Sequence, residues 1–147
     1  MTSMLSKYNF GFTGTKYLMS VRQMNSMRNL LRGHPEWMEA HHGDCVGSDK
    51  MFHDFCRIDR PDITIVGHPP VLDKHRAFCV FDKIHPEKDY FERNEDIVNH
   101  SRVMMAVPKL DVEEIRSGTW HAIRYTRKMR KALIIIWPSG RIEYERC

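Results

Sequence analysis

Apolar residues along the chain gather in short runs that alternate with amphipathic segments. Five runs are rich in β-branched or aromatic residues and stop at glycine or proline, which is typical of strands: residues 8–14, 37–43, 62–70, 102–108 and 131–138. The later runs, such as "ALIIIW", show no alternation with polar residues, as expected of strands covered on both faces. A last short segment, "RIEYE" at 141–145, predicts an edge strand.

Segments with helical periodicity separate these runs. The first, residues 20–33, has one apolar face made of Val21, Met24, Met27 and Leu31. Ser20 and Gln23 have the spacing of a capping box, and Gly33 suits the position after the helix end. Further helices are predicted at 50–57, at 89–100, where Asp89 and Glu92 repeat the capping spacing, and at 117–130.

Residues 71–88 are the least regular part of the pattern. They mix charged residues with prolines, and only "AFCVF" at 77–81 predicts a short strand. The segment is therefore interpreted as a loop that covers a site.

The alternation of strands and helices predicts an α/β fold, with residues 1–147 forming one domain. We expect a single Rossmann-like three-layer sandwich with a mostly parallel sheet. In such sheets, ligands bind outside the carboxyl ends of the strands, near a switch in strand order.

Composition narrows the function classes. The 41% hydrophobic and 29% charged residues are ordinary for a globular protein, and the four cysteines form no CxxC pair. The first residues lack the apolar core of a signal peptide, and "ALIIIW" is too short for a membrane span, so we expect a cytoplasmic protein with free thiols.

The net charge of +4 suits an anionic partner. The basic run 124–131 has the place of a solvated helix end, so nucleic acid is not the expected partner.

Three predicted strand-to-helix turns carry glycine and polar residues, and all three should lie on one edge of the sheet. Their candidate ligand-binding residues are Gly14 and Thr15, then Gly43, Asp44, Gly47 and Asp49, and finally Arg116, Ser117, Gly118, Thr119 and Trp120. Glycine lets backbone N–H groups approach a ligand, and a helix N-terminus favours an anion such as phosphate. The alternative is that the glycines only permit turns, that Ser117 or Thr119 only caps a helix, and that Trp120 packs in the core. The chain contains neither a Walker loop nor GxGxxG.

Histidine and aspartate also cluster in the second turn: His41, His42, Asp44, Asp49 and His53. No HExxH or Cys/His zinc spacing accompanies them, so nucleotide contact by this loop is favoured and no metal or cofactor is predicted.

Six motifs follow one another along the chain: "GFTGT", "HGDCVGSDKMFH", "VGHPP", "YFERNEDIV", "MMAVP" and "RSGTWHAIRYTRK". In this order they resemble the SLOG superfamily, and the resemblance covers nearly the whole chain. That superfamily includes the LOG nucleoside-monophosphate phosphoribohydrolases and the DNA-processing Smf proteins. The resemblance implies a Rossmann-like nucleotide-binding domain and a homodimer with sites near the subunit boundary. Pro69, Arg93 and Asn94 lie in these motifs and join the predicted ligand-binding set.

In LOG enzymes an arginine and a Gly-Thr segment hold the nucleotide phosphate, and a glutamate three residues beyond the threonine acts on the ribose. Arg93 matches that arginine and is the candidate catalytic residue; Gly118 and Thr119 match the Gly-Thr pair, so residues 117–119 are the implied phosphate cradle. The glutamate position holds Ala122. A carboxylate would have to come from elsewhere, and the candidates are Asp44, Glu92, Glu95, Glu113 and Glu114.

Three functions follow, in order of expectation. The first is binding of a nucleotide or nucleotide-derived ligand, with Trp120, Tyr90 or Phe12 available to stack on a base. On this hypothesis Arg93→Ala and Gly118→Val remove binding and leave the fold intact. The second is an N-glycosidase of the phosphoribohydrolase kind, and the third is an Smf-like DNA-binding module.

Overall fold

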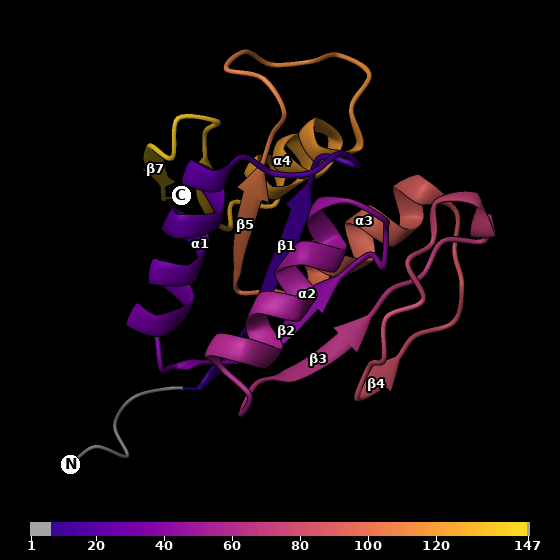
Figure 1. Cartoon of the computed structure of the whole chain (residues 1–147). Coiled ribbons are helices and arrows are strands. Elements are labelled where there is room, and N and C mark those ends of the chain that lie inside the picture. Colours follow the sequence, from indigo (N-terminus) through magenta and orange to yellow (C-terminus); the bar gives the residue numbers. More distant parts are fainter. Residues whose placement is uncertain (1–6, 147) are drawn as a thin grey trace.

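The computed structural model describes residues 7–146 and contains a seven-stranded sheet (Figure 1). Its strands are β1 (Tyr8–Gly14), β2 (Trp37–His42), β3 (Thr64–Gly67), β4 (Lys83–Ile84), β5 (Val103–Val107), β6 (Ala132–Ile136) and β7 (Ile142–Glu145). They lie in the order β4-β3-β2-β1-β5-β6-β7, and every pairing is parallel except that of β6 with β7. The predicted α/β fold with a mostly parallel sheet is confirmed.

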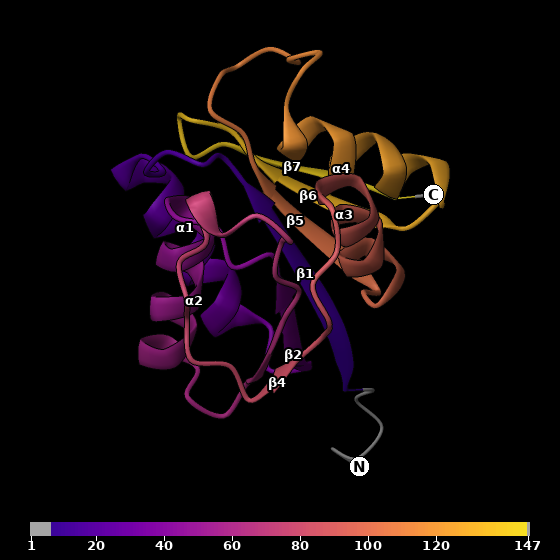
Figure 2. The same ribbon diagram turned by 90° about the vertical axis from the view of Figure 1, so that its right-hand side faces the viewer.

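Helices cover both faces of the sheet: α1 (Val21–Gly33), α2 (Ser48–Asp59), α3 (Tyr90–Asn99) and α4 (Gly118–Lys128). Figure 2 shows α1 and α2 on one face and α3 and α4 on the other, which is the predicted three-layer arrangement. Within residues 7–146, no helix is both long enough and apolar enough to cross a bilayer. Residues 1–6, part of the segment compared with a signal peptide, and Cys147 lie outside the described residues.

The central strands are apolar on both faces because each face packs against helices. Along β5, alternate residues enter two different core clusters, Val103, Met105 and Val107 in one and Met104 and Ala106 in the other. Successive side chains of a strand point to opposite faces, so two covered faces remove the usual alternation with polar residues.

Local capping fixes where α1 begins. Ser20 accepts a hydrogen bond from the Gln23 amide at 3.0 Å, and the Gln23 side chain accepts one from the Ser20 amide at 2.9 Å, which confirms the capping box. Gly33, predicted to follow the helix, is instead its last residue, and His34 is the C-cap. The Arg60 guanidinium donates to the carbonyls of Leu31 and His34 there, so no left-handed glycine is needed to satisfy them.

The predicted strand at 77–81 is wrong, because these residues are irregular and the strand of this region is β4. Their amides bond the loop after β2: the Ala77 N–H donates to the Asp44 carbonyl at 2.8 Å, and the Cys79 N–H donates to the Asp44 carboxylate at 2.9 Å. Segment 71–88 is therefore a largely irregular segment that packs over the end of β2.

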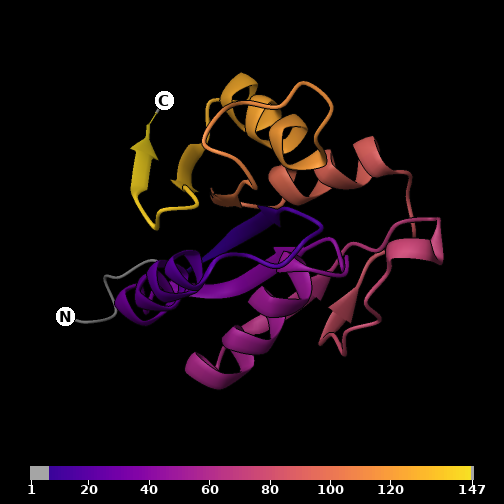
Figure 3. The same ribbon diagram turned by 45° about the horizontal axis from the view of Figure 1, so that its top comes forward.

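The strand order reverses next to β1, since β2 lies on one side of it and β5 on the other. Loops that follow these parallel strands meet at one edge of the sheet, which Figure 3 tilts toward the viewer. A switch of this kind opens a crevice at the carboxyl ends of the strands.

Candidate functional site

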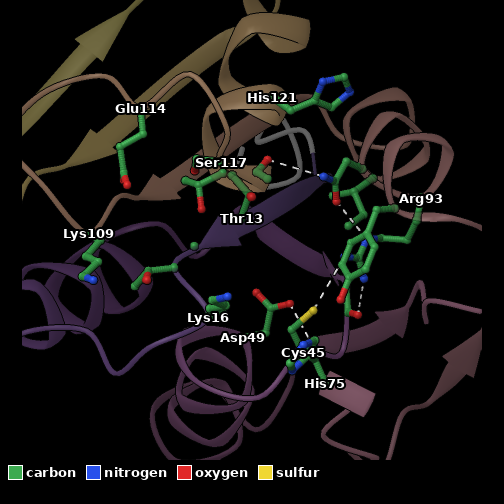
Figure 4. Close-up of a pocket in the computed structure, with 18 of the residues that line it drawn as sticks. Thr13, Lys16, Cys45, Asp49, His75, Arg93, Lys109, Glu114, Ser117 and His121 are labelled. Atoms are coloured by element: carbon green, nitrogen blue, oxygen red, sulfur yellow. Dashed lines mark hydrogen bonds between the residues drawn. The ribbon is translucent and has the colours of Figure 1, made fainter. Parts of the chain in front are cut away.

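A cleft of about 770 Å³ lies at this edge, and its walls come from the three predicted turns and from α3 (Figure 4). Ten of the predicted ligand-binding residues line it: Gly14, Thr15, Gly43, Asp49, Arg93, Asn94, Arg116, Ser117, Gly118 and Thr119. The expectation that the three turns share one edge is confirmed. Asp44, Gly47, Pro69 and Trp120 are not among the lining residues.

Asp44 and Gly47 hold the second turn in shape. The Asp44 carboxylate is fully buried and accepts from Arg76 Nε at 2.9 Å, which ties segment 71–88 to the end of β2. Gly47 has a φ of 87°, and a Cβ there would collide with the Lys16 carbonyl. Asp44 and Gly47 therefore contact other parts of the protein and do not line the cleft.

Two of the three aromatic rings predicted to stack on a base belong to the core. The Trp120 side chain is only 2% exposed and packs in the cluster between α3, α4 and the sheet, so that expectation is wrong for Trp120. Phe12 is fully buried and stacks on Phe52, with ring centroids 4.3 Å apart. Phe12 and Tyr90 both line the cleft, although the Phe12 ring is buried, and the structure adds two exposed rings there, Tyr17 and Phe91.

The N-terminus of α4 opens into the cleft. Ser117 is its N-cap, and the Ser117 hydroxyl accepts from the Trp120 amide at 3.2 Å. The first-turn amides of a helix have no intrahelical partner, so those of Gly118 and Thr119 remain available to a ligand at the cleft wall. The capping role and the binding role of this turn are therefore compatible.

Three cations line the same cleft as this helix end. Lys16, Lys109 and Arg116 line the cleft and are exposed, and no carboxylate among residues 7–146 forms a salt bridge with them. Lys16 and Lys109 were missed from sequence, although each lies next to a predicted turn or strand end. An exposed lysine carries no local signal that separates a ligand contact from an ordinary surface charge.

Arg93 lines the cleft, yet most of its donors are committed to the protein. Its Nη1 donates to the carbonyls of Gly43 and His68, and its Nε donates to Asn94 Oδ1 at 2.8 Å. Only Nη2, which contacts Cys45 Sγ at 3.6 Å, has an N–H to spare for a ligand. The side chain is 4% exposed. These contacts predict that Arg93→Ala destabilises the fold, in contrast to the expectation from sequence that the fold would stay intact.

Asp49 is the buried carboxylate of the cleft. It lies in the first turn of α2 and accepts from the Cys45 amide at 3.1 Å. Burial raises the pKa of Asp49 to about 6, and this outweighs the lowering effects of Arg93 and of the backbone amides. Such a carboxyl changes charge close to neutral pH while facing the cleft.

This raised pKa predicts a pH-dependent effect of Asp49→Asn on stability. The folded state keeps the Asp49 proton up to about pH 6, whereas the unfolded chain releases it near its ordinary value of 3.8. The stability contributed by that proton is fully present below pH 3.8 and is lost as the pH rises through about 6. We expect the stability of Asp49→Asn relative to wild type to rise by about 2–3 kcal/mol between pH 4 and pH 8, measured by urea unfolding. Parallel pH curves for the two proteins would contradict this assignment.

The other carboxylate candidates are placed less favourably. Ala122, the position of the family glutamate, is 1% exposed in a core cluster and is not a lining residue. Glu113 pairs with Arg124 at 2.6 Å, and Glu95 lies 3.3 Å from His121. Of the five carboxylates named from sequence for this role, only Glu114 lines the cleft; Asp49 was not among them.

Three of the five cations in the basic run 124–131 make contacts within the chain, two of them in exposed salt bridges. Arg124 pairs with Glu113 and Arg127 with Glu145, each at under 3 Å. Lys131 donates to the carbonyls that end α3, at 2.8–3.1 Å. These contacts account for most of the charge that an Smf-like DNA-binding function would use.

Comparison with known proteins identifies relatives in fold. No family model and no curated protein matches the chain. The molybdenum cofactor binding protein from the phototrophic bacterium Rippkaea orientalis aligns with a TM-score of 0.68 and 17% identity, over 90% of this chain and 78% of that one. The Northeast Structural Genomics Consortium target TM1055 aligns with a TM-score of 0.60 and 15% identity, over 86% of this chain and 72% of that one. The chain therefore shares a Rossmann-like α/β fold with these two proteins.

Proposed function

We propose that the cleft binds a nucleotide or nucleotide-derived ligand through its phosphate group. The observation that carries this proposal is the meeting of the α4 N-terminus with Lys16, Lys109 and Arg116 in one cleft. Free first-turn amides, a helix dipole and cations without carboxylate partners together favour an anion with several acceptor oxygens.

The remaining walls suit the rest of a nucleotide. Phe91 is 62% exposed, so its ring is accessible to a planar base. Tyr17 is 53% exposed, and the Lys109 ammonium lies 4.1 Å from the centroid of its ring, so a base would stack there only after this lysine turns toward the ligand. The Asp49 carboxylate can accept hydrogen bonds from sugar hydroxyls. The volume of about 770 Å³ is within the range of small-molecule sites.

The fold neighbour from R. orientalis supports a wider choice of probes. That protein is a molybdenum cofactor binding protein. We therefore include that cofactor with the nucleotides as a ligand to test.

The test compares nucleoside monophosphates with the corresponding nucleosides by titration calorimetry. We expect at least one monophosphate to bind, and its nucleoside to bind at least about tenfold more weakly, because charge-assisted hydrogen bonds contribute about 1.5–3 kcal/mol each. Inorganic phosphate should compete with the nucleotide. Equal affinity for nucleotide and nucleoside, or no binding across nucleotides and molybdenum cofactor, would refute the proposal.

Hydrolysis of the N-glycosidic bond is a second candidate, favoured by the position of Asp49. A carboxylate near the ribose stabilises an oxocarbenium-like transition state, and Asp49 would take the part of the glutamate missing at Ala122. The same nucleotide mixtures, assayed for free base by chromatography, distinguish cleavage from binding. Base release by the wild type and not by Asp49→Asn supports hydrolysis, and its absence leaves binding as the function.

A further inference from the structure

Four histidines from separate segments gather outside the cleft, on the face of the sheet that α3 covers. His41 lies in β2, His68 follows β3, His85 follows β4, and His100 is the C-cap of α3. Neighbouring ring centroids are 5.0 Å apart for His41 and His68, 4.4 Å for His68 and His85, and 4.8 Å for His85 and His100. Their strands β2, β3 and β4 lie side by side at the edge of the sheet (Figure 1).

The hydrogen bonds of two of these rings fix their tautomers. His41 Nε2 lies 2.9 Å from a carboxylate oxygen of Glu39, which can only accept, so Nε2 carries the proton and Nδ1 keeps its lone pair. His100 Nδ1 lies 2.8 Å from the Asp96 carbonyl, so its Nε2 lone pair is also free. Metal-binding histidines adopt this arrangement, with the second N–H donated to a carboxylate or a carbonyl.

Three of the rings are close enough to share one ion. One nitrogen each of His41, His68 and His85 lies within 4.8 Å of the other two, and His41 Nδ1 is 2.8 Å from His68 Nε2. Tetrahedral zinc, with Zn–N bonds of about 2.0–2.1 Å, places its nitrogens about 3.3 Å apart. Shifts of the rings by roughly an ångström or less would therefore suffice.

The surroundings keep these imidazoles neutral. Burial lowers the pKa of His41 to about 4 and that of His68 to about 2, and it also lowers the pKa of His85. Protons therefore do not compete for the lone pairs at neutral pH. Because His41 Nδ1 is an acceptor, the His68 proton lies on Nε2 and is donated to it at 2.8 Å; binding of an ion therefore requires this proton to move to His68 Nδ1, which is buried without a hydrogen-bond partner among the described residues.

A second cluster of similar composition has different hydrogen bonds. It consists of His42, His53 and Cys79. The Asp44 amide donates to His42 Nδ1 at 3.0 Å, so the proton of His42 is on Nε2 and points at His53 Nδ1, 2.9 Å away. Burial, the largest cause, raises the pKa of the Cys79 thiol to about 12. An ion bound to His42 Nε2 would have to displace its proton, and that proton cannot move to Nδ1, which accepts from the Asp44 amide, whereas Nδ1 of His68 has no partner among the described residues. The second cluster is therefore a hydrogen-bond network and serves as a control.

We propose that His41, His68 and His85 bind one divalent transition-metal ion of the zinc class, with His100 next to its open coordination position. Imidazole ligands suit Zn²⁺, Co²⁺, Ni²⁺ and Cu²⁺ rather than Mg²⁺ or Ca²⁺. Glu39, bonded to His41, offsets part of the charge of the ion and orients its ligand.

The full chain, without a histidine tag and stripped with a chelator, is titrated with Zn²⁺ against a chromophoric chelator and with Co²⁺ by visible spectroscopy. We expect one equivalent of Zn²⁺ to bind and Co²⁺ to show a d–d band of a histidine-bound ion. His85→Ala should weaken Zn²⁺ binding by at least about a hundredfold, and Glu39→Ala by about 10–100-fold. His85 is partly exposed and makes no side-chain hydrogen bond within residues 7–146, so the apo variant should melt like the wild type.

His53→Gln is the matched control, because it alters the second cluster and leaves the proposed ligands in place. It should bind Zn²⁺ like the wild type, and His121→Ala at the cleft gives a further control that should do the same. The proposal is overturned if the wild type binds no stoichiometric Zn²⁺, if His85→Ala keeps wild-type affinity, or if His53→Gln loses binding as strongly as His85→Ala does.

Discussion

Arg93→Ala is expected to lower the free energy of unfolding by about 3–5 kcal/mol, measured by urea denaturation. The substitution leaves the buried carbonyls of Gly43 and His68 without their donor and opens a cavity beneath the cleft. It also releases the end of β2 from α3 and from the residue after β3. The loss should therefore appear in the absence of any ligand.

Two comparisons separate this structural role from a role in binding. Arg116→Ala removes an exposed charge from the rim of the same cleft and should change stability by no more than about 0.5 kcal/mol. Gly43→Ala should destabilise like Arg93→Ala, because the new Cβ would meet the Arg93 guanidinium. If Arg93→Ala is as stable as Arg116→Ala, the buried arginine does not hold these three elements together.

Gly118→Pro is expected to weaken binding of a nucleoside monophosphate by about tenfold to a hundredfold, with the fold retained. Gly118 is the first residue of α4, where proline is favoured, and Ser117 has φ −133° and ψ 131°, the conformation that proline requires before it. The change deletes one amide donor at the proposed phosphate position. Calorimetry measures the affinity, and thermal melting checks the fold.

Gly118→Ala is the matched control because it keeps the N–H. A Cβ at this position would meet only Asn94 Nδ2, at an ordinary 3.6 Å, so alanine should bind the nucleotide as the wild type does. The structure therefore favours proline over the valine substitution as a test, since valine also keeps the donor. Equal affinity for the proline and alanine variants would exclude the Gly118 amide from the site.

The parts of the fold that were predicted correctly depend on local signals. The capping box of Ser20 and Gln23 is complete within four residues, and β5 and β6 are apolar runs that need two covered faces. The strand expected at 77–81 failed because the partner of its amides is Asp44, more than 30 residues away. The inference of burial also failed for this apolar run, because Phe78 is 59% exposed and Val80 is 82% exposed.

At the candidate site too, local sequence signals predicted some features correctly, and contacts between residues far apart in the sequence were not predicted. The three turns were placed together because the carboxyl ends of parallel strands share an edge. The commitment of Arg93 to Gly43 and His68 joins residues 50 and 25 positions apart, which no spacing rule encodes. Trp120 lies on the first turn of α4, but its position on the helix turns the ring into the core. The histidine cluster also has no sequence spacing, since its members come from four segments.

The most direct test of phosphate recognition at the α4 N-terminus is an NMR titration of the ¹⁵N-labelled protein with AMP and the other nucleoside monophosphates. For the monophosphate that binds, the account predicts the largest amide shifts at Gly118 and Thr119, with further shifts at Lys16 and in the loop that contains Lys109 and Arg116. Saturable shifts centred elsewhere, such as the turn at Gly140, or no shifts with any monophosphate, would contradict it.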